Sequence, residues 1–117
     1  MTKNSRLRDM QYDLISEIQR RMNTLELSVK NLRKSAEDYA NAERDYKIHL
    51  RAEVLRLRDE GMPVGLIDKV IYGVPSVADK RFARDVAQAV YEANQESINT
   101  QKLQIRILDN QVQREWK

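Results

Sequence analysis

The chain lacks cysteine, and most of it lacks the residues that break helices. Without cysteine it can form no disulfide framework, thiolate metal site or cysteine nucleophile. Its three glycines and two prolines all lie between Gly61 and Pro75, so residues 1–60 and 76–117 contain neither type. Strand-like sequence is confined to residues 69–72, a segment too short to nucleate a sheet. These absences predict an all-α chain with one reversal of direction.

Residues that carry catalysis or bind metals are scarce as well. His49 is the single histidine, and no His-x-x-x-His or Glu-x-x-His element accompanies it. The sequence has no glycine-rich phosphate loop, nucleophile elbow or Ser/His/Asp set. We therefore expect no enzyme activity, no cofactor and no catalytic or metal-binding residue.

Long hydrophobic runs are also missing. No segment approaches the roughly 18 apolar residues that a membrane-spanning helix needs. The first charged residues are not followed by the apolar run of a signal peptide. We expect a cytoplasmic protein without a membrane contact.

Two apolar stripes with helical spacing occupy the long breaker-free segments. The first arm, about 8–60, repeats at intervals of three and four, which predicts left-handed wrapping on a partner helix. The second arm, about 77–116, begins behind Pro75 with Ser76 as the expected N-cap. The first stripe consists of Leu14, Ile18, Met22, Leu25, Val29, Leu32, Ala36, Tyr39, Ala42, Tyr46, Leu50, Val54 and Leu57. The second consists of Phe82, Val86, Ala89 or Val90, Ala93, Ile98, Ile105, Leu108, Val112 and Trp116.

These stripes predict a single domain over residues 1–117, a long antiparallel two-helix coiled-coil hairpin with a short helical tip at 61–76. If the arms meet symmetrically about the tip, facing residue numbers sum to about 135. Tyr46 then faces Ala89 and lies near Tyr91, and Ile18 faces Trp116. Several apolar residues fall outside the stripes, and a second copy could bury them, so we expect a homo-oligomer. They are Tyr12, Leu27, Ile48, Leu55, Leu103 and Ile107.

Basic residues concentrate toward both chain ends although the net charge is only +3. Residues 1–34 contain eight Lys and Arg against four acids, and residues 102–117 contain four against two. A hairpin brings these segments to one open end. They form either an ordinary solvated surface or a docking site for nucleic acid or an acidic partner. The candidate contacts at this end are Arg20, Arg21, Lys30, Arg33, Lys34, Lys102 and Arg106.

The tip has two interpretations. In the first, its order of short helix, Gly-Val turn and serine-led helix resembles a helix-turn-helix unit, although Asp68 stands where a small buried residue is expected. Lys80, Arg81 and Arg84 would then contact DNA, together with Val77, Ala78 and Asp79. In the second, the tip is a helical cap. Its apolar residues Val64, Leu66, Ile67, Val70 and Ile71 would shield Leu57, Val74 and Phe82.

Four segments carry a resemblance to a known group of proteins. The segments 42–47, 55–64, 82–87 and 102–106 read AERDYK, LRLRDEGMPV, FARDVA and KLQIR. Over residues 38–116 the chain resembles small helical early-region proteins of phages and prophages of Gram-positive bacteria. The resemblance implies a bacterial cytoplasm and a role in replication, recombination or countering host defence through binding. It assigns no functional residue.

The sequence therefore favours a non-enzymatic interaction protein. We expect it to bind a host or phage nucleic-acid-processing complex through its helical faces, its tip or its basic open end. Two alternatives stay open at this point. One is a helix-turn-helix DNA-binding protein dimerised through the coiled coil, and the other is an antagonist of a host defence nuclease.

Overall fold

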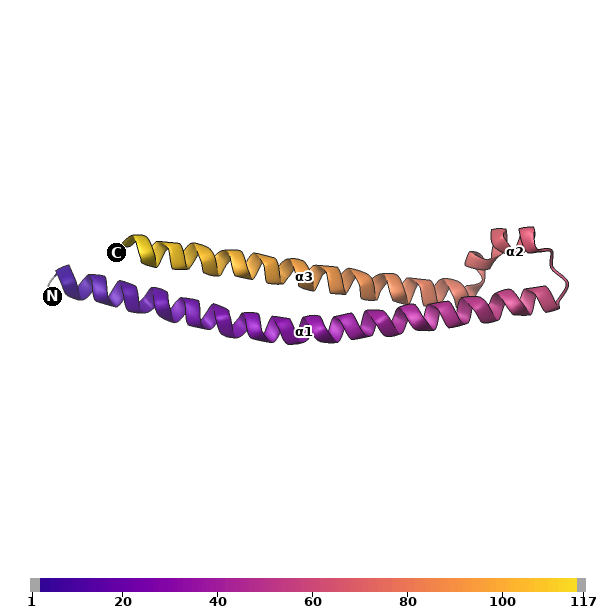
Figure 1. Cartoon of the computed structure of the whole chain (residues 1–117), viewed down its shortest axis with the longest axis horizontal. Helices are drawn as coiled ribbons and strands as arrows, with labels where there is room; N and C mark the ends of the chain where they lie inside the picture. Colours follow the sequence, from indigo (N-terminus) through magenta and orange to yellow (C-terminus); the bar gives the residue numbers. More distant parts are fainter. Residues whose placement is uncertain (1–2, 116–117) are drawn as a thin grey trace. The chain divides into compact units, whose positions relative to one another are not determined.

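The computed structural model describes residues 3–115, which form three α-helices and one 3-10 turn and contain no strand (Figure 1). The α-helices are α1 (Lys3–Asp59), α2 (Val64–Val70) and α3 (Pro75–Glu115), and the 3-10 turn is η1 (Ile71–Gly73). The predicted all-α hairpin of two long helices with a short helical tip is confirmed. The chain divides into two compact units. The terminal unit contains Met1–Leu32 and Ala93–Lys117, and the tip unit contains Arg33–Glu92.

Gly61 ends α1. Its φ is +90°, a left-handed conformation that suits glycine because a side chain would clash with the backbone. The Gly61 N–H donates to the Arg58 carbonyl at 2.9 Å, and the Met62 N–H donates to the Leu57 carbonyl at 3.1 Å. This pair of bonds is the Schellman arrangement, and the accompanying apolar contact is present because Met62 packs on the core that contains Leu57.

The start of α3 differs from the expectation. We predicted Ser76 as the N-cap, but the helix begins at Pro75 and Val74 precedes it in an extended conformation. The Ala78 N–H donates to the Val74 carbonyl at 2.9 Å and so makes the first bond of the helix. Proline is favoured at a first helical position because its φ is preset and its missing N–H would have no helical partner there. Ser76 therefore lies inside the first turn.

The core of the tip unit lies where α2 and η1 meet both long helices. Val77 is fully buried, and Ile67 and Ile71 reach it from the short helical elements. Leu57 and Tyr46 complete the cluster from α1. Ile67 and Ile71 thus shield Leu57, as the cap interpretation expects. Three other members of the predicted cap, Val64, Leu66 and Val70, are exposed instead, as is Phe82, which the cap was expected to cover.

The register within the tip unit differs from the symmetric prediction. The Tyr39 and Tyr91 ring centroids lie 6.0 Å apart, and the Arg84 guanidinium carbon lies 4.6 Å from the Tyr46 ring centroid. Tyr46 therefore faces Arg84 rather than Ala89, and Tyr91 pairs with Tyr39. The reason is that the last turns of α1 pack against α2 and η1. As a consequence, α3 joins α1 farther from the reversal than a symmetric tip would allow.

The face that α3 turns toward α1 in the tip unit also differs from the prediction. Arg84, Ala87 and Tyr91 are half-buried there, whereas the predicted residues Phe82, Val86, Ala89 and Val90 are exposed. Phe82 is 70% exposed. Arg84 takes an inward position because its guanidinium stacks on Tyr46 and its charge approaches Glu43 at 3.7 Å. Aromatic and charged groups thus fill the interior that was assigned to aliphatic residues.

In the terminal unit the inward face of α3 matches the prediction, since Ile98 is buried and Ile105, Leu108 and Val112 are half-buried. Ala93, which the stripe also included, is exposed, as is Met22 on α1. A polar layer interrupts the apolar ones, because Gln101 donates through its amide nitrogen to Ser28 Oγ at 2.9 Å and to Ser97 Oγ at 3.2 Å. The expected contact of Ile18 with Trp116 lies outside the described residues.

Replacing Ile67 by alanine should lower the free energy of unfolding by about 2–5 kcal/mol, because the side chain is almost fully buried in the tip core. Urea unfolding followed by the helical circular dichroism signal would measure the loss. Val64→Ala on the same short helix is the matched control and should change stability by less than about 0.5 kcal/mol, because Val64 is 63% exposed. Equal losses for both variants would contradict the described core.

Candidate functional site

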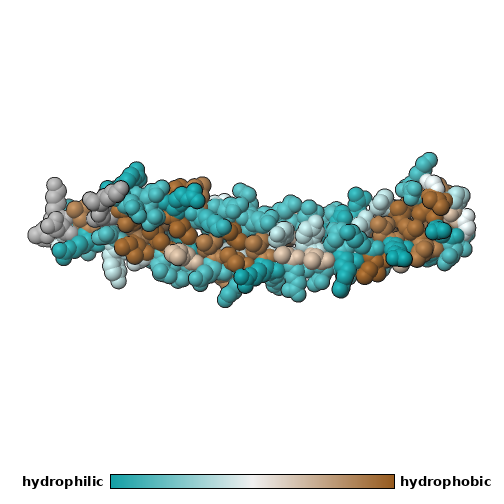
Figure 2. All heavy atoms as spheres, viewed as in Figure 1, coloured by the Kyte–Doolittle hydropathy of each residue, from teal (hydrophilic) through white to brown (hydrophobic). Residues whose placement is uncertain are grey.

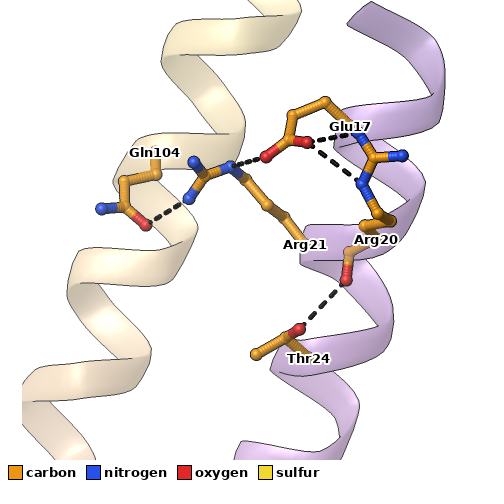
Figure 3. Close-up of polar contacts among 5 residues, drawn as sticks. All are labelled: Glu17, Arg20, Arg21, Thr24 and Gln104. Atoms are coloured by element: carbon orange, nitrogen blue, oxygen red, sulfur yellow. Dashed lines mark hydrogen bonds and ion pairs between the residues drawn. The ribbon is translucent and has the colours of Figure 1, made fainter. Parts of the chain in front are cut away.

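A groove in the terminal unit brings together charged and amide side chains from both long helices (Figure 3). Its volume is about 360 Å³. Two of the predicted contact residues, Arg20 and Arg21, line it. The other lining residues are Glu17 and Thr24 from α1 and Gln101 and Gln104 from α3.

Glu17 holds both arginines of the groove. One of its oxygens accepts hydrogen bonds from Arg20 Nη2 at 2.6 Å and Arg20 Nε at 3.1 Å, and the other lies 3.1 Å from Arg21 Nε. Arg21 also reaches α3, where its Nη1 donates to Gln104 Oε1 at 2.8 Å (Figure 3). Arg21 therefore links the two helices of this unit, and Arg20 lies beside the link.

The Glu17 carboxylate is the electrostatic centre of the groove. The hydrogen bond from Arg20 lowers its pKa most, and the charges of Arg20 and Arg21 lower it further, while partial desolvation acts in the opposite direction. Glu17 thus stays ionised and neutralises part of the arginine charge. An anionic ligand at this groove would have to compete with that carboxylate.

Two buried polar atoms at the groove have unused hydrogen-bonding capacity. Gln101 Oε1 is buried and accepts no hydrogen bond from any residue in the described part of the chain. Arg21 Nε is also buried, and its short contact with Glu17 is an ion pair without the alignment of a hydrogen bond. A buried acceptor without a donor is costly, so the site suits a water molecule or another small donor beside Gln101.

The remaining basic residues predicted for the open end fall into both units. Lys30, Lys102 and Arg106 are exposed in the terminal unit. Arg33 and Lys34 belong to the tip unit, and Lys34 pairs with Asp38 at 3.4 Å. The terminal unit carries ten Lys and Arg against seven Asp and Glu, so a moderate positive charge belongs to it.

Some of the residues predicted to contact DNA instead make contacts within the tip unit. Val77 is 0% exposed, so it is a core residue. Arg84 stacks on Tyr46 and donates to Asp85 at 2.8 Å, and this hydrogen bond raises the pKa of its guanidinium. Arg81 lies over the Tyr72 ring at 5.1 Å. The structure leaves Asp79, Lys80 and Arg81 exposed, buries Val77 and leaves Arg84 half-buried.

The tip presents an apolar surface to solvent, and Figure 2 shows hydrophobic atoms gathered at the end of the molecule that carries α2. Val64, Leu66, Val70 and Tyr72 are all exposed there. Gly65 stands among them within α2, and a Cβ at this position would meet no described atom within 4 Å apart from its chain neighbours and the backbone of its own helix. The packing of the chain itself therefore does not require glycine at position 65.

Sequence reasoning did not find several of the residues that form these surfaces. The groove brings together Glu17, Thr24, Gln101 and Gln104 only because the helices adopt a particular register. The charge totals of the chain ends could not indicate this register. A row of exposed arginines on α1, at 44, 51 and 58, was also missed. Its signal was present in the sequence, since the three residues are spaced by seven and so share one helix face.

Within residues 3–115, no group of three or more His, Cys, Asp or Glu side chains could hold a metal ion. The described helices contain no stretch with the length and apolar character needed to cross a membrane. No protein-family model, curated protein or solved structure matches the chain.

Replacing Arg20 by glutamine should raise the pKa of Glu17, because the hydrogen bond from Arg20 is the largest cause of its depression. NMR titration of the Glu17 carboxyl carbon in both proteins would measure the change. Arg21→Gln should raise the pKa by a smaller amount. Because folding lowers this pKa, Glu17 stabilises the folded state at pH values above the usual titration range of a glutamate. This stabilisation is lost as the pH falls through the pKa of Glu17 in the folded state. Equal pKa values of Glu17 in the parent protein and in Arg20→Gln would contradict the described contact between Arg20 and Glu17.

Replacing Gln101 by leucine should raise the free energy of unfolding by roughly 1 kcal/mol, because it removes a buried acceptor without a donor and adds apolar volume between Ile98 and Ile105. Urea unfolding would measure the gain. Gln113→Leu at an exposed position of α3 is the control and should have an effect below about 0.5 kcal/mol. A loss of stability in Gln101→Leu would show that the polar layer stabilises the unit.

Proposed function

We propose that this protein acts by binding rather than by catalysis, and that its tip docks onto a nucleic-acid-processing complex of a phage or its bacterial host. The class of partner comes from the resemblance to phage early-region proteins over residues 38–116. The location comes from the exposed apolar residues of α2 and η1. In this proposal the protein works in the bacterial cytoplasm, where it blocks or scaffolds its target.

The tip surface supports this proposal because its composition is unfavourable for a surface that meets only water. The exposed apolar residues include Leu66, Val70 and Tyr72, which lie next to a well-packed core. Their neighbours Ile67 and Ile71 are buried in that core. Grouped exposed apolar residues of this kind mark interaction sites. Their position on a short helix over a rigid core also limits the entropy lost on binding.

Gly65 is the observation that carries the proposal. A glycine in a helix interior costs up to about 1 kcal/mol relative to alanine, and Gly65 is the second residue of α2. Apart from its chain neighbours and the backbone of its own helix, no described atom lies within 4 Å of a Cβ built at this position. A close approach of another molecule to the backbone explains a glycine that the fold does not require. The exposed residues Val64 and Leu66 lie on either side of it, so the approach would bring a partner against the same surface.

The two alternatives require different contacts of the tip unit. In a helix-turn-helix DNA-binding mode, Val77 is buried and Arg84 is half-buried against Tyr46, so the DNA contacts would rest on Lys80 and Arg81. It requires duplex DNA binding with a steep salt dependence that Arg81→Ala reduces. Antagonism of a defence nuclease is a particular case of protein binding at the tip, and it requires that the captured partner be that nuclease.

A photo-crosslinking amino acid at position 70 should capture one predominant protein in a Gram-positive host cell, and mass spectrometry should identify it as part of a nucleic-acid-processing or nuclease complex. Leu66→Asp should abolish capture because it places a charge in the apolar contact. Gly65→Gln should also abolish it while leaving the helical signal intact. Leu27→Asp is the matched control, since Leu27 is an exposed leucine of the terminal unit, and it should leave capture unchanged.

Capture that survives both tip substitutions would contradict docking through the tip. Capture of a partner unrelated to nucleic acid would contradict the proposed class of target. Specific binding of duplex DNA by the free protein, lost in Arg81→Ala and retained in Leu66→Asp, would replace the proposal by the DNA-binding alternative.

A further inference from the structure

The face of α1 that points away from α3 in the tip unit carries a regular pattern of arginine and aliphatic residues. Arg44, Arg51 and Arg58 are spaced by seven, and Ile48 and Leu55 stand between them with the same spacing. All five are exposed. At about 1.5 Å rise per residue, the arginine row extends over about 21 Å.

The charge of this arginine row is not neutralised within the chain. Arg56 on the neighbouring face forms ion pairs with Glu53 and Glu60, at 2.7 Å and 2.8 Å. Arg44, Arg51 and Arg58 form no ion pair with any residue in the described part of the chain. The face therefore combines apolar area with three available cations, which suits a partner that is both apolar and acidic.

The outward face of α3 in the same unit has that composition. It exposes Phe82, Val86 and Val90, the residues that were expected to point inward. Three exposed acids lie near them. Asp79 shares the face of Phe82 and Val86, whereas Asp85 and Glu92, which are spaced by seven, lie together along one edge of it. Asp85 is partly neutralised by Arg84, and Glu92 accepts a hydrogen bond from Gln88 at 3.1 Å. The acids extend over residues 79–92, or about 20 Å, which matches the length of the arginine row.

We infer that the arginine face of α1 binds the acidic apolar face of α3 from a second copy of this chain. An antiparallel alignment places Arg44 opposite Glu92, Arg51 opposite Asp85 and Arg58 opposite Asp79. The same alignment brings Leu55 against Phe82 and places Ile48 between Val86 and Val90. One register thus satisfies the charges and the apolar residues together, as in paired helices whose flanking charges set the alignment.

A second copy fits these faces better than a nucleic acid does. Ile48 and Leu55 offer no hydrogen-bond donor to phosphates or bases, and no aromatic residue in the row could stack on a base. The acids on α3 would repel phosphate, so nucleic acid would leave Phe82, Val86 and Val90 exposed. Pairing between copies covers both faces at once.

Such an interface is heterologous, because each copy uses a different face on each side. It leads to a ring or an open array, and assembly depends on protein concentration. This inference goes beyond the proposed function, since it involves the flanks of the tip unit and leaves α2 available to a partner.

Charge exchange between the two faces tests the pairing. Analytical ultracentrifugation of the full chain over a concentration series should show self-association of the parent protein. Arg44→Glu with Arg58→Glu should weaken it by about tenfold or more, and Asp79→Lys with Glu92→Lys should do the same, because each pair of substitutions places like charges opposite each other. An equimolar mixture of the two variants should associate again, and a single chain with all four substitutions should associate with itself.

Two cysteine variants test the register, because the parent chain contains no cysteine. Leu55→Cys mixed with Phe82→Cys should form a disulfide-linked dimer under mild oxidation, whereas Leu27→Cys mixed with Phe82→Cys should not. Circular dichroism serves as the folding control for every variant. A parent protein that remains monomeric at all concentrations would overturn the inference. An unchanged association after the arginine substitutions, or a mixture that fails to associate, would also overturn it.

Discussion

The hairpin depends on the small core that Leu57, Ile67, Ile71 and Val77 form at the reversal of the chain. Each long helix on its own exposes an apolar stripe that water disfavours, and the two can pair only if the chain turns back in the correct register. The short helical elements provide this register, because Ile67 and Ile71 pack against Leu57 near the end of α1. As a result, α3 joins α1 farther from the reversal. The positions of Tyr39, Tyr46, Arg84 and Tyr91 follow from that displacement.

Beyond this aliphatic core, the α3 side of the tip unit contributes Arg84 and Tyr91 to the interior in place of aliphatic residues. Arg84 can lie inside because Tyr46 covers its guanidinium and Glu43 and Asp85 supply opposite charge. This arrangement leaves Phe82, Val86 and Val90 outside. The inward position of Arg84 thus goes together with an apolar outer face on α3. Both proposals depend on surfaces of the tip unit that its own packing leaves exposed.

The architecture was largely predictable from the sequence, and the details of the site were not. Glycine and proline confined to one segment indicate a single reversal, and the spacing of three and four identifies the inner face of α1 almost completely. The inner face of α3 near the tip escaped prediction because hydropathy ranks Phe82 above Arg84, whereas stacking and ion pairing reverse that order locally. The groove at Arg21 escaped for another reason. The meeting of Glu17, Arg21 and Gln104 depends on register, and charge totals over long segments contain no information about it.

The left-handed residue that ends α1 has a wider consequence. Only glycine adopts a φ of +90° with little strain, and any other residue at position 61 would pay about 1–2 kcal/mol to keep the chain turned back on itself. If this conformation were lost and the connection straightened, α3 could pair with the α1 of another molecule. The conformation of Gly61 therefore favours a self-contained fold over a domain-swapped pair in which two chains exchange their second helices.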